Sequence, residues 1–176
     1  ISGLAGSSRQ LLIASLHEQL ERPLVIVTHN MYSAQKMVDD LHECLPPERV
    51  LLYPANEWMV AEAVAASPEI QAQRIDVLSR MSAGFRGIVV TPIAGARRLV
   101  PARAAFKEAE LTVSTDETYV LQEFLEKMAA NGYERVERVE SRGEMSVRGG
   151  IVDFHPLTSE SAYRIEWFGD DIDSIR

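Results

Sequence analysis

Apolar residues in the first hundred positions follow two spacings, one typical of amphipathic helices and one typical of buried strands. Helical spacing follows residues 3–9 and recurs over 34–45 and 70–81. Between these segments lie three short apolar runs rich in β-branched residues, at 24–28, 50–53 and 87–91. Runs of this kind are typical of buried parallel strands. Their alternation with helices predicts a parallel α/β layer sandwich.

Proline and capping residues mark where these elements begin and end. Pro23 precedes the first apolar run, and Pro54 and Pro92 follow the second and third. Ser67 followed by Pro68 combines a favoured N-cap with a proline at the first helical position, which predicts a helix start there.

The pattern changes near residue 111. A further helix, with apolar positions between 120 and 128, is expected to stop at Asn131-Gly132. Five short strand candidates follow at 135–139, 144–147, 150–154, 163–167 and 172–175, most of them separated by glycine turns. Closely spaced strands of this kind form antiparallel hairpins. We therefore expect an α/β chain: a parallel-sheet domain at 1–110, then a small α+β domain with an antiparallel sheet at 111–176.

Composition narrows the classes of function. The 176 residues carry a formal net charge of −8, so a generally basic surface for nucleic acid is not indicated. The single cysteine, Cys44, excludes an internal disulfide and a cysteine-rich metal site. We see no signal peptide and no long apolar span, which favours a cytoplasmic protein without membrane contact. The first residues already lie inside a motif, so we expect a fragment of a longer protein.

Residues 3–10 resemble a phosphate-binding loop that lacks its catalytic end. A working loop, G-x-x-x-x-G-K-[ST], cradles phosphate with backbone N–H groups and needs its lysine and its Mg²⁺-binding hydroxyl. Here Ser8, Arg9 and Gln10 replace the second glycine, the lysine and the hydroxyl residue. A simple helix entry is the alternative, and its N-terminus would still attract an anion. The degenerate loop would comprise Gly3, Gly6, Ser7, Ser8, Arg9 and Gln10.

No set of residues forms a recognisable catalytic or metal site. His29 follows a predicted parallel strand, at the end of the sheet where ligands bind in α/β folds. The simpler interpretation, which we favour, is that Asn30 caps the next helix and His29 bonds to backbone. The acidic stretch 169–173 lacks the spacing of a calcium loop and is expected to be a turn.

Arginines in the second segment suggest a contact surface for a partner. Arg135, Arg142 and Arg148 lie at strand ends or glycine turns, where long side chains can converge on one exposed face, with Phe154 as an apolar neighbour. Arginine is suited to bidentate contacts with carboxylates. The alternative is a solvated sheet face, since glutamates are interspersed among these arginines and offset their field.

Several of these segments together resemble the N-terminal module of bacterial transcription-repair coupling factors, a module shared with the excinuclease subunit UvrB. The resemblance is carried by residues 3–14, by Thr28-His29-Asn30 and by the run 142–156, and it continues through 163–176. It therefore covers essentially the whole chain. UvrB has an intact phosphate loop and a long DNA-clamping hairpin. The broken loop, and the lack of an aromatic-rich insert between Tyr53 and Ser67, favour the coupling factor.

The resemblance implies a non-catalytic module for nucleotide excision repair. Its second domain would bind the damage-recognition subunit UvrA, with Arg135, Arg142, Arg148 and Phe154 as the contact residues. The parent protein would use ATP and Mg²⁺ in a separate motor, and would contact RNA polymerase and DNA through other domains. We expect no cofactor in this fragment and weak DNA binding, because phosphate contacts need a basic face. The alternative is an ATP-binding, helicase-like domain of a UvrB-type subunit.

Overall fold

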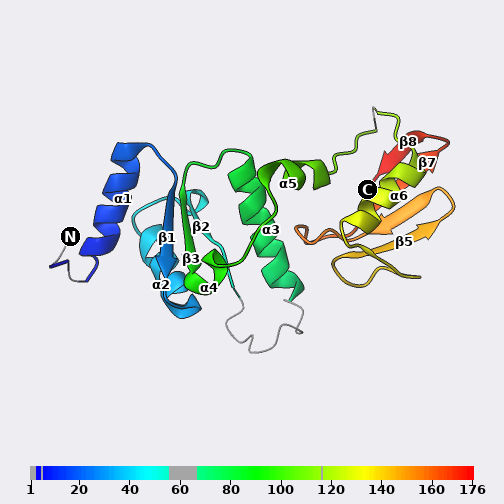
Figure 1. The fold of residues 1–176 in the computed structure, drawn as a ribbon. Helices are drawn as coiled ribbons and strands as arrows, with labels where there is room; N and C mark the ends of the chain where they lie inside the picture. The colour runs from blue at the N-terminus through cyan, green and yellow to red at the C-terminus, as the bar shows by residue number, and fades with distance from the viewer. Residues whose placement is uncertain (1–2, 5, 56–66, 116) are drawn as a thin grey trace. The chain divides into compact units, whose positions relative to one another are not determined.

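The structure of the chain is a computed structural model that describes residues 3–4, 6–55, 67–115 and 117–176 (Figure 1). Residues 56–66, which make up most of the segment where the sequence lacks an aromatic-rich insert, lie outside the described residues. By their contacts the residues fall into two units, Ile1–Val100 and Pro101–Arg176, called unit 1 and unit 2 below. Each unit is described by itself.

Unit 1 contains a three-stranded parallel sheet. Its strands are β1 (Leu24–Thr28), β2 (Val50–Leu52) and β3 (Ile88–Pro92), arranged in the order β1-β3-β2. Leu24 and Val50 both align with Ile88, on either side of the central strand. The predicted parallel sheet is therefore confirmed, with each of its three apolar runs forming a strand.

Two helices of unit 1 begin at the capping residues expected from the sequence. Asn30 accepts a hydrogen bond from the Ser33 backbone N–H at 2.8 Å, and Ser67 accepts one from the Ile70 N–H at 3.4 Å. These bonds satisfy backbone donors that a helix start leaves free. The elements are α1 (Ser8–Leu20), α2 (Met31–His42), the short 3₁₀ turn η1 (Pro47–Arg49), α3 (Pro68–Ser82) and α4 (Ile93–Ala96).

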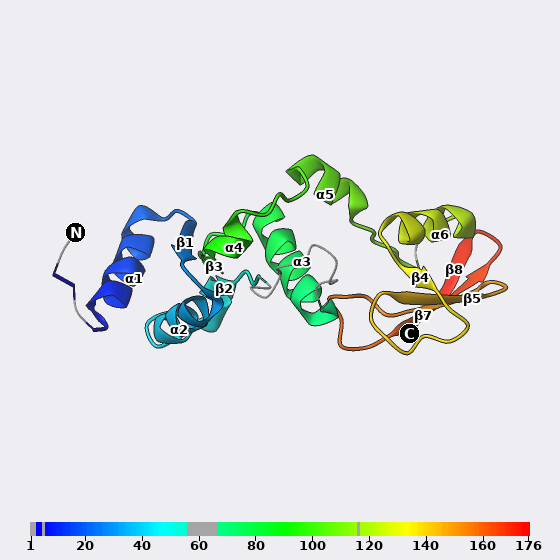
Figure 2. The same ribbon diagram turned by 60° about the horizontal axis from the view of Figure 1, so that its bottom comes forward.

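Helices bury both faces of the central strand of unit 1. Ile88 and Val90 are fully buried with Leu41 of α2, whereas Val89 packs with Val77 of α3 on the opposite face (Figures 1 and 2). This division follows from the alternation of side chains along a strand. Residues 87–91 were predicted to form a buried strand. The run Ile88-Val89-Val90 is apolar without alternation because helices cover both faces of this strand.

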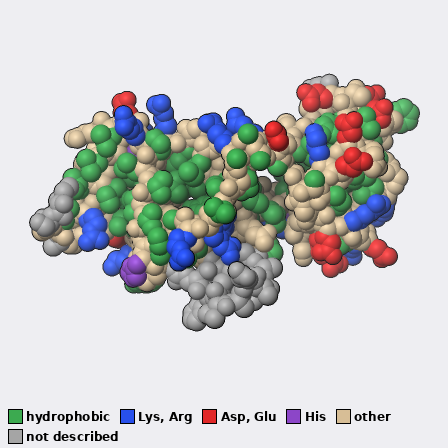
Figure 3. All heavy atoms as spheres, viewed as in Figure 1, with side chains coloured by type: hydrophobic (Ala, Val, Ile, Leu, Met, Phe, Trp, Pro, Cys, Tyr) green, Lys and Arg blue, Asp and Glu red, His purple; other side chains and the backbone are tan. Residues whose placement is uncertain are grey.

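The edge strand β1 is covered less completely. Leu24 and Ile26 pack against the α2 side, but Val25 and Val27, which alternate with them, are 59% and 49% exposed. Hydrophobic side chains gather on unit 1 in the view of Figure 3. Among the described residues, nothing covers these two valines as α3 covers Val89.

Unit 2 is built on a five-stranded sheet in the order β4-β5-β6-β7-β8. Strands β5 to β8 pair as antiparallel neighbours, as predicted. The elements are α5 (Arg103–Ala109), α6 (Leu121–Ala130), β4 (Glu134–Arg135), β5 (Glu144–Arg148), β6 (Ile151–Phe154), β7 (Tyr163–Phe168) and β8 (Asp171–Ile175).

The first strand of this sheet corrects the prediction of a purely antiparallel sheet. It has two residues rather than the expected 135–139, and it runs parallel to β5. The cause lies in the connection: the Glu144 carboxylate accepts hydrogen bonds from the backbone N–H groups of Glu140 and Ser141, at 2.7 and 2.8 Å. The chain is thereby held in a loop where the sequence predicted a longer strand.

Helix α6 packs its apolar side on one face of this sheet. Phe124 is 1% exposed, and its ring centroid lies 5.1 Å from Trp167, 5.9 Å from Phe154 and 6.2 Å from Tyr119. Met128 of the same helix is buried in the same cluster. One aromatic side chain therefore joins the helix, the sheet and the segment that precedes the helix.

The turn between β5 and β6 needs glycine at two positions for different reasons. Gly149 has a φ of +63°, a conformation that residues with a side chain rarely adopt. Gly150 lies against β7: a Cβ at this position would be 2.7 Å from the Trp167 carbonyl oxygen. The Trp167 backbone N–H donates to the Gly150 carbonyl at 2.7 Å, which fixes that close approach.

Candidate functional site

The sheet of unit 2 separates apolar and charged side chains onto its two faces. Register places Met145, Val152 and Ile165 toward α6, where all three are buried. Because side chains alternate along each strand, their neighbours lie on the opposite face. We call this the outer face, and its central residues are Ser146, Arg148, Ile151, Asp153, Arg164 and Glu166.

Asp153 is the centre of an ion-pair network on the outer face. Its Oδ1 accepts from Arg164 Nε at 2.5 Å, and its Oδ2 accepts from Arg164 Nη2 at 2.9 Å. The same Oδ2 accepts from Arg148 Nη2 at 2.5 Å. One carboxylate thus binds guanidinium groups from both neighbouring strands, β5 and β7.

The network shifts the acid–base properties of its members. Hydrogen bonds from Arg164, and secondarily from Arg148, hold the pKa of Asp153 below its usual value despite partial burial. The hydrogen bonds and charge of Asp153 raise the pKa of Arg164 in turn. The network therefore favours the ionised form of Asp153 and the cationic form of Arg164.

A second ion pair extends the charged surface toward β8. The Glu166 carboxylate accepts from Arg176 Nη2. Arg176 is well exposed, whereas Glu166 is about one-quarter exposed. Three arginines thus surround two carboxylates on and beside the outer face.

An exposed aromatic residue lies at one end of the same sheet. Phe168, the last residue of β7, is 82% exposed and pairs with Asp171 of β8. The preceding residue, Trp167, bonds to Gly150 in the turn that follows Arg148. Phe168 and Arg148 are therefore at the same end of the sheet. Aromatic residues and arginine are the residue types enriched at protein interfaces.

The structure does not bring the four predicted contact residues onto one face. Arg148 is exposed on the outer face, but Phe154 is half-buried on the other face, between the rings of Phe124 and Tyr133. Arg142 precedes β5 and donates to the Leu157 carbonyl at 3.4 Å. The length of β5, roughly 16 Å at ~3.3 Å per residue, separates it from Arg148.

Arg135 is exposed on the edge strand, where its register partner is Met145 of the helix-covered face. It therefore does not belong to the outer face either. Sequence reasoning, in turn, missed Arg164 and Phe168. The available signal was the alternation in 163–168, which puts Arg164 and Glu166 opposite to the apolar Ile165.

The predicted phosphate loop forms the entry to α1. Gly3 and Gly6 both have positive φ, and Ser7 precedes the helix without making a side-chain cap. Gln10 donates from Nε2 to Asp40 Oδ2 at 2.6 Å, so a carboxylate lies beside the first turn of the helix. This negative charge disfavours a bound anion. The assignment as a degenerate phosphate loop stays a prediction.

The structure bears out the capping function of Asn30. Its side chain caps α2, and its amide also contacts the His29 ring at 2.9 Å. The second ring nitrogen of His29 lies 3.5 Å from the Ser33 hydroxyl, so the observed partners are side chains rather than backbone. Nothing at this position resembles a catalytic arrangement.

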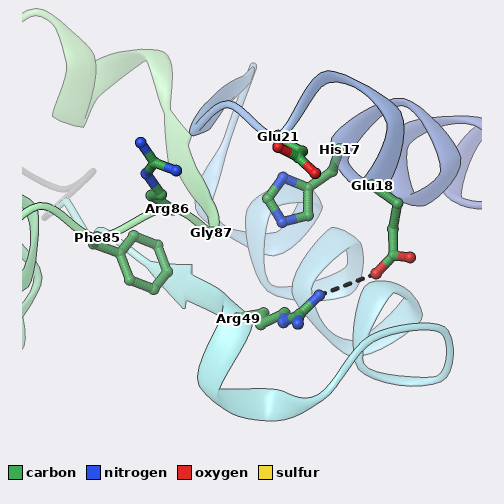
Figure 4. A pocket seen from close by; sticks show the side chains of 7 residues that line it. All are labelled: His17, Glu18, Glu21, Arg49, Phe85, Arg86 and Gly87. Atoms are coloured by element: carbon green, nitrogen blue, oxygen red, sulfur yellow. Dashed lines mark hydrogen bonds and ion pairs between the residues drawn. The ribbon is translucent and has the colours of Figure 1, made fainter.

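A cleft of about 620 Å³ lies in unit 1 at the start of β2 and β3, lined by His17, Glu18, Glu21, Arg49, Phe85, Arg86 and Gly87. Arg49 points to Glu18 and pairs with it at 3.0 Å (Figure 4). Ligands in open α/β sheets bind at the opposite, carboxyl ends of the strands. The cleft is lined by both carboxylates and arginines, which together favour no single class of ligand. We therefore assign no site to this cleft.

In the described part of the chain, no group of three or more histidine, cysteine, aspartate or glutamate side chains is placed to hold a metal ion. The helices of the same residues are too short or too polar to span a lipid bilayer.

Comparison with known proteins places the outer face in context. Residues 111–176 match the family model described as "UvrB interaction domain". The whole chain is 41% identical to the transcription-repair-coupling factor of Bacillus subtilis (strain 168), and 32% identical to those of Staphylococcus aureus strains bovine RF122 / ET3-1 and USA300. The chain spans 15% of the length of these curated relatives. The resemblance to transcription-repair-coupling factors that the sequence predicted is thus confirmed over the whole of this chain.

Proposed function

We propose that the chain is the recruitment module of a transcription-repair-coupling factor and binds UvrA through the outer face of unit 2. The observation that carries this proposal is the match of residues 111–176 to a UvrB interaction domain. UvrB and the coupling factor would then present the same kind of surface to UvrA. The module itself would be non-catalytic and need no cofactor.

The proposed parent protein is an ATP-driven DNA translocase that displaces stalled RNA polymerase and then delivers UvrA to the damage. Its motor, and its contacts with polymerase and DNA, would lie in other domains. The acidic charge of this chain supports weak DNA binding by the module, because non-specific DNA affinity comes from phosphate neutralisation.

The chemistry of the outer face supports a protein partner with acidic side chains. Arg148 and Arg164 present planar guanidinium groups, which pair bidentately with carboxylates. Phe168 adds an exposed apolar surface at the Arg148 end. Arginine and aromatic residues dominate binding energy in many interfaces.

Arg148→Glu is the direct test of this surface. We expect UvrA affinity to fall by about 2–5 kcal/mol, because the partner carboxylate would meet a like charge and lose its hydrogen bonds. Binding of purified UvrA to the immobilised 176-residue chain measures the effect, and circular dichroism checks the fold. The matched control is Arg138→Glu, which makes the same charge change at an exposed loop position.

The same assay separates the outer face from the other predicted contacts. Arg135→Glu and Arg142→Glu change arginines that lie elsewhere in unit 2. Loss of binding in these variants, with Arg148→Glu binding normally, would move the partner to the opposite end of β5. If all three variants bind as wild type, the arginines do not form the UvrA contact.

Nucleotide titration tests the non-catalytic part of the proposal. We expect no Mg²⁺-dependent saturable ATP binding and no hydrolysis, since Arg9 and Gln10 replace the lysine and the metal-binding hydroxyl. Isothermal calorimetry with Mg·ATP measures binding, and phosphate release measures turnover. Micromolar binding that is lost in the Arg9→Ala variant would instead support the alternative, an ATP-binding domain of the UvrB type.

A further inference from the structure

We infer that Asp153 is a positioning residue, whose carboxylate holds Arg148 and Arg164 together so that both guanidinium groups meet acidic side chains of the partner at once. The inference rests on the proposed UvrA-binding function. Asp153, although negatively charged, would then favour binding to an acidic surface of the partner.

The geometry of the three side chains gives the first argument. They come from three adjacent strands, and Oδ2 of Asp153 accepts from Nη2 of Arg148 and of Arg164, at 2.5 and 2.9 Å. The side chain of Asp153 is only 17% exposed, whereas those of Arg148 and Arg164 are 62% and 40% exposed. The carboxylate is therefore the most enclosed of the three groups, and the two arginines extend further into solvent.

The second argument concerns what the arginines would do without it. Two cationic groups repel each other, and a free arginine side chain samples many rotamers. A shared carboxylate offsets the repulsion and restricts the rotamers before the partner arrives, which reduces the cost of binding. Among the described residues, neither Arg148 nor Arg164 makes an ion pair with another side chain. Asp153 thus provides the ionic contact that fixes them.

The arrangement also defines the partner chemistry. Arg148 uses Nη2 and Arg164 uses Nε and Nη2 to reach Asp153, which leaves other N–H groups of both guanidiniums for a ligand. Two adjacent guanidinium forks fit two carboxylates that are close together. We therefore expect an acidic pair of side chains on the contacting surface of UvrA.

The test asks whether the substitution Asp153→Asn raises or lowers the affinity for UvrA. If only net charge mattered, Asp153→Asn would strengthen binding to an acidic partner, because it removes a negative charge. Positioning predicts the reverse, a loss of about tenfold or more in UvrA affinity, within the range of coupling measured between contacting residues. Asp173→Asn is the matched control: it makes the same charge change at an exposed position of β8 whose side chain holds no arginine.

A double-mutant cycle separates positioning from a general structural effect. In the Arg148→Ala/Arg164→Ala background, Asp153→Asn has no arginine left to release, so we expect the residual affinity to stay within about twofold. A loss of the same size in both backgrounds, or a gain in affinity with the wild-type arginines, would overturn the inference. Urea titration of each variant shows that loss of binding does not come from unfolding.

The outcomes also distinguish this inference from the function on which it rests. If wild type binds UvrA and Arg148→Glu does not, while Asp153→Asn binds at least as tightly as wild type, the positioning role is wrong and the proposed function stands. If wild type shows no affinity for purified UvrA, the proposed function is wrong, and the inference is rejected with it.

Discussion

Phe124→Ala is expected to lower the free energy of unfolding of unit 2 by about 3–5 kcal/mol. The side chain is 1% exposed and contacts the rings of Tyr119, Phe154 and Trp167. Its removal leaves a cavity between α6 and the sheet as well as losing buried apolar area. A loss of this size is a large part of the 5–15 kcal/mol that usually separates folded and unfolded domains.

Urea titration followed by circular dichroism measures this effect. The matched control is Phe168→Ala, since Phe168 is 82% exposed and its truncation should change stability by less than about 0.5 kcal/mol. The two variants should differ in what they affect. Phe124→Ala should lower stability, whereas Phe168→Ala should keep the fold and weaken UvrA binding. Equal stability of both variants would contradict the packing described for α6.

Leu41→Ala is expected to cost unit 1 about 2–5 kcal/mol. Leu41 is completely buried and belongs to the same cluster as Val50, Ile88 and Val90, where α2 covers the sheet. The expected loss of stability spans this range because it depends on how far neighbouring side chains relax into the cavity left by the leucine. The comparison variant is Leu11→Ala in α1, because Leu11 is 56% exposed.

Thermal or urea unfolding of the whole chain gives the measurement for these two leucine variants. We expect the midpoint to fall for Leu41→Ala and to stay near that of wild type for Leu11→Ala. Should Leu11→Ala destabilise the chain as much as Leu41→Ala, α1 would bury more of its surface than the structure shows.

The sequence was sufficient for the repetitive parts of the fold. Apolar runs such as Leu24–Thr28 were long enough to predict strands, and Ser67-Pro68 marked the start of α3 within one residue. It was not sufficient for β4, because the local sequence at 135–139 does not reveal that the Glu144 carboxylate binds the backbone of the following loop. A contact between distant residues decided that segment.

The candidate site was predictable in its chemistry and less so in its geometry. Arginine at position 148 was chosen from its turn, and the structure places it on an exposed face. Phe154 was chosen as an apolar neighbour of the arginines, but the alternation of β6 turns it toward Phe124, on the face opposite to Arg148. Arg164 and Phe168 come from the next strand in the sheet. Only the registers of β5 with β6 and of β6 with β7 show that they share a surface with Arg148.

The close approach of Gly150 to Trp167 affects how mutational scans of this surface should be interpreted. Any side chain at position 150 would meet the β7 backbone, 2.7 Å from its Cβ, and would push the Arg148 turn away from its neighbour strand. Such a variant would register as defective in recruitment although glycine contributes no recognition group. Position 150 would therefore look like an epitope residue in a screen by binding alone, while its requirement is purely steric.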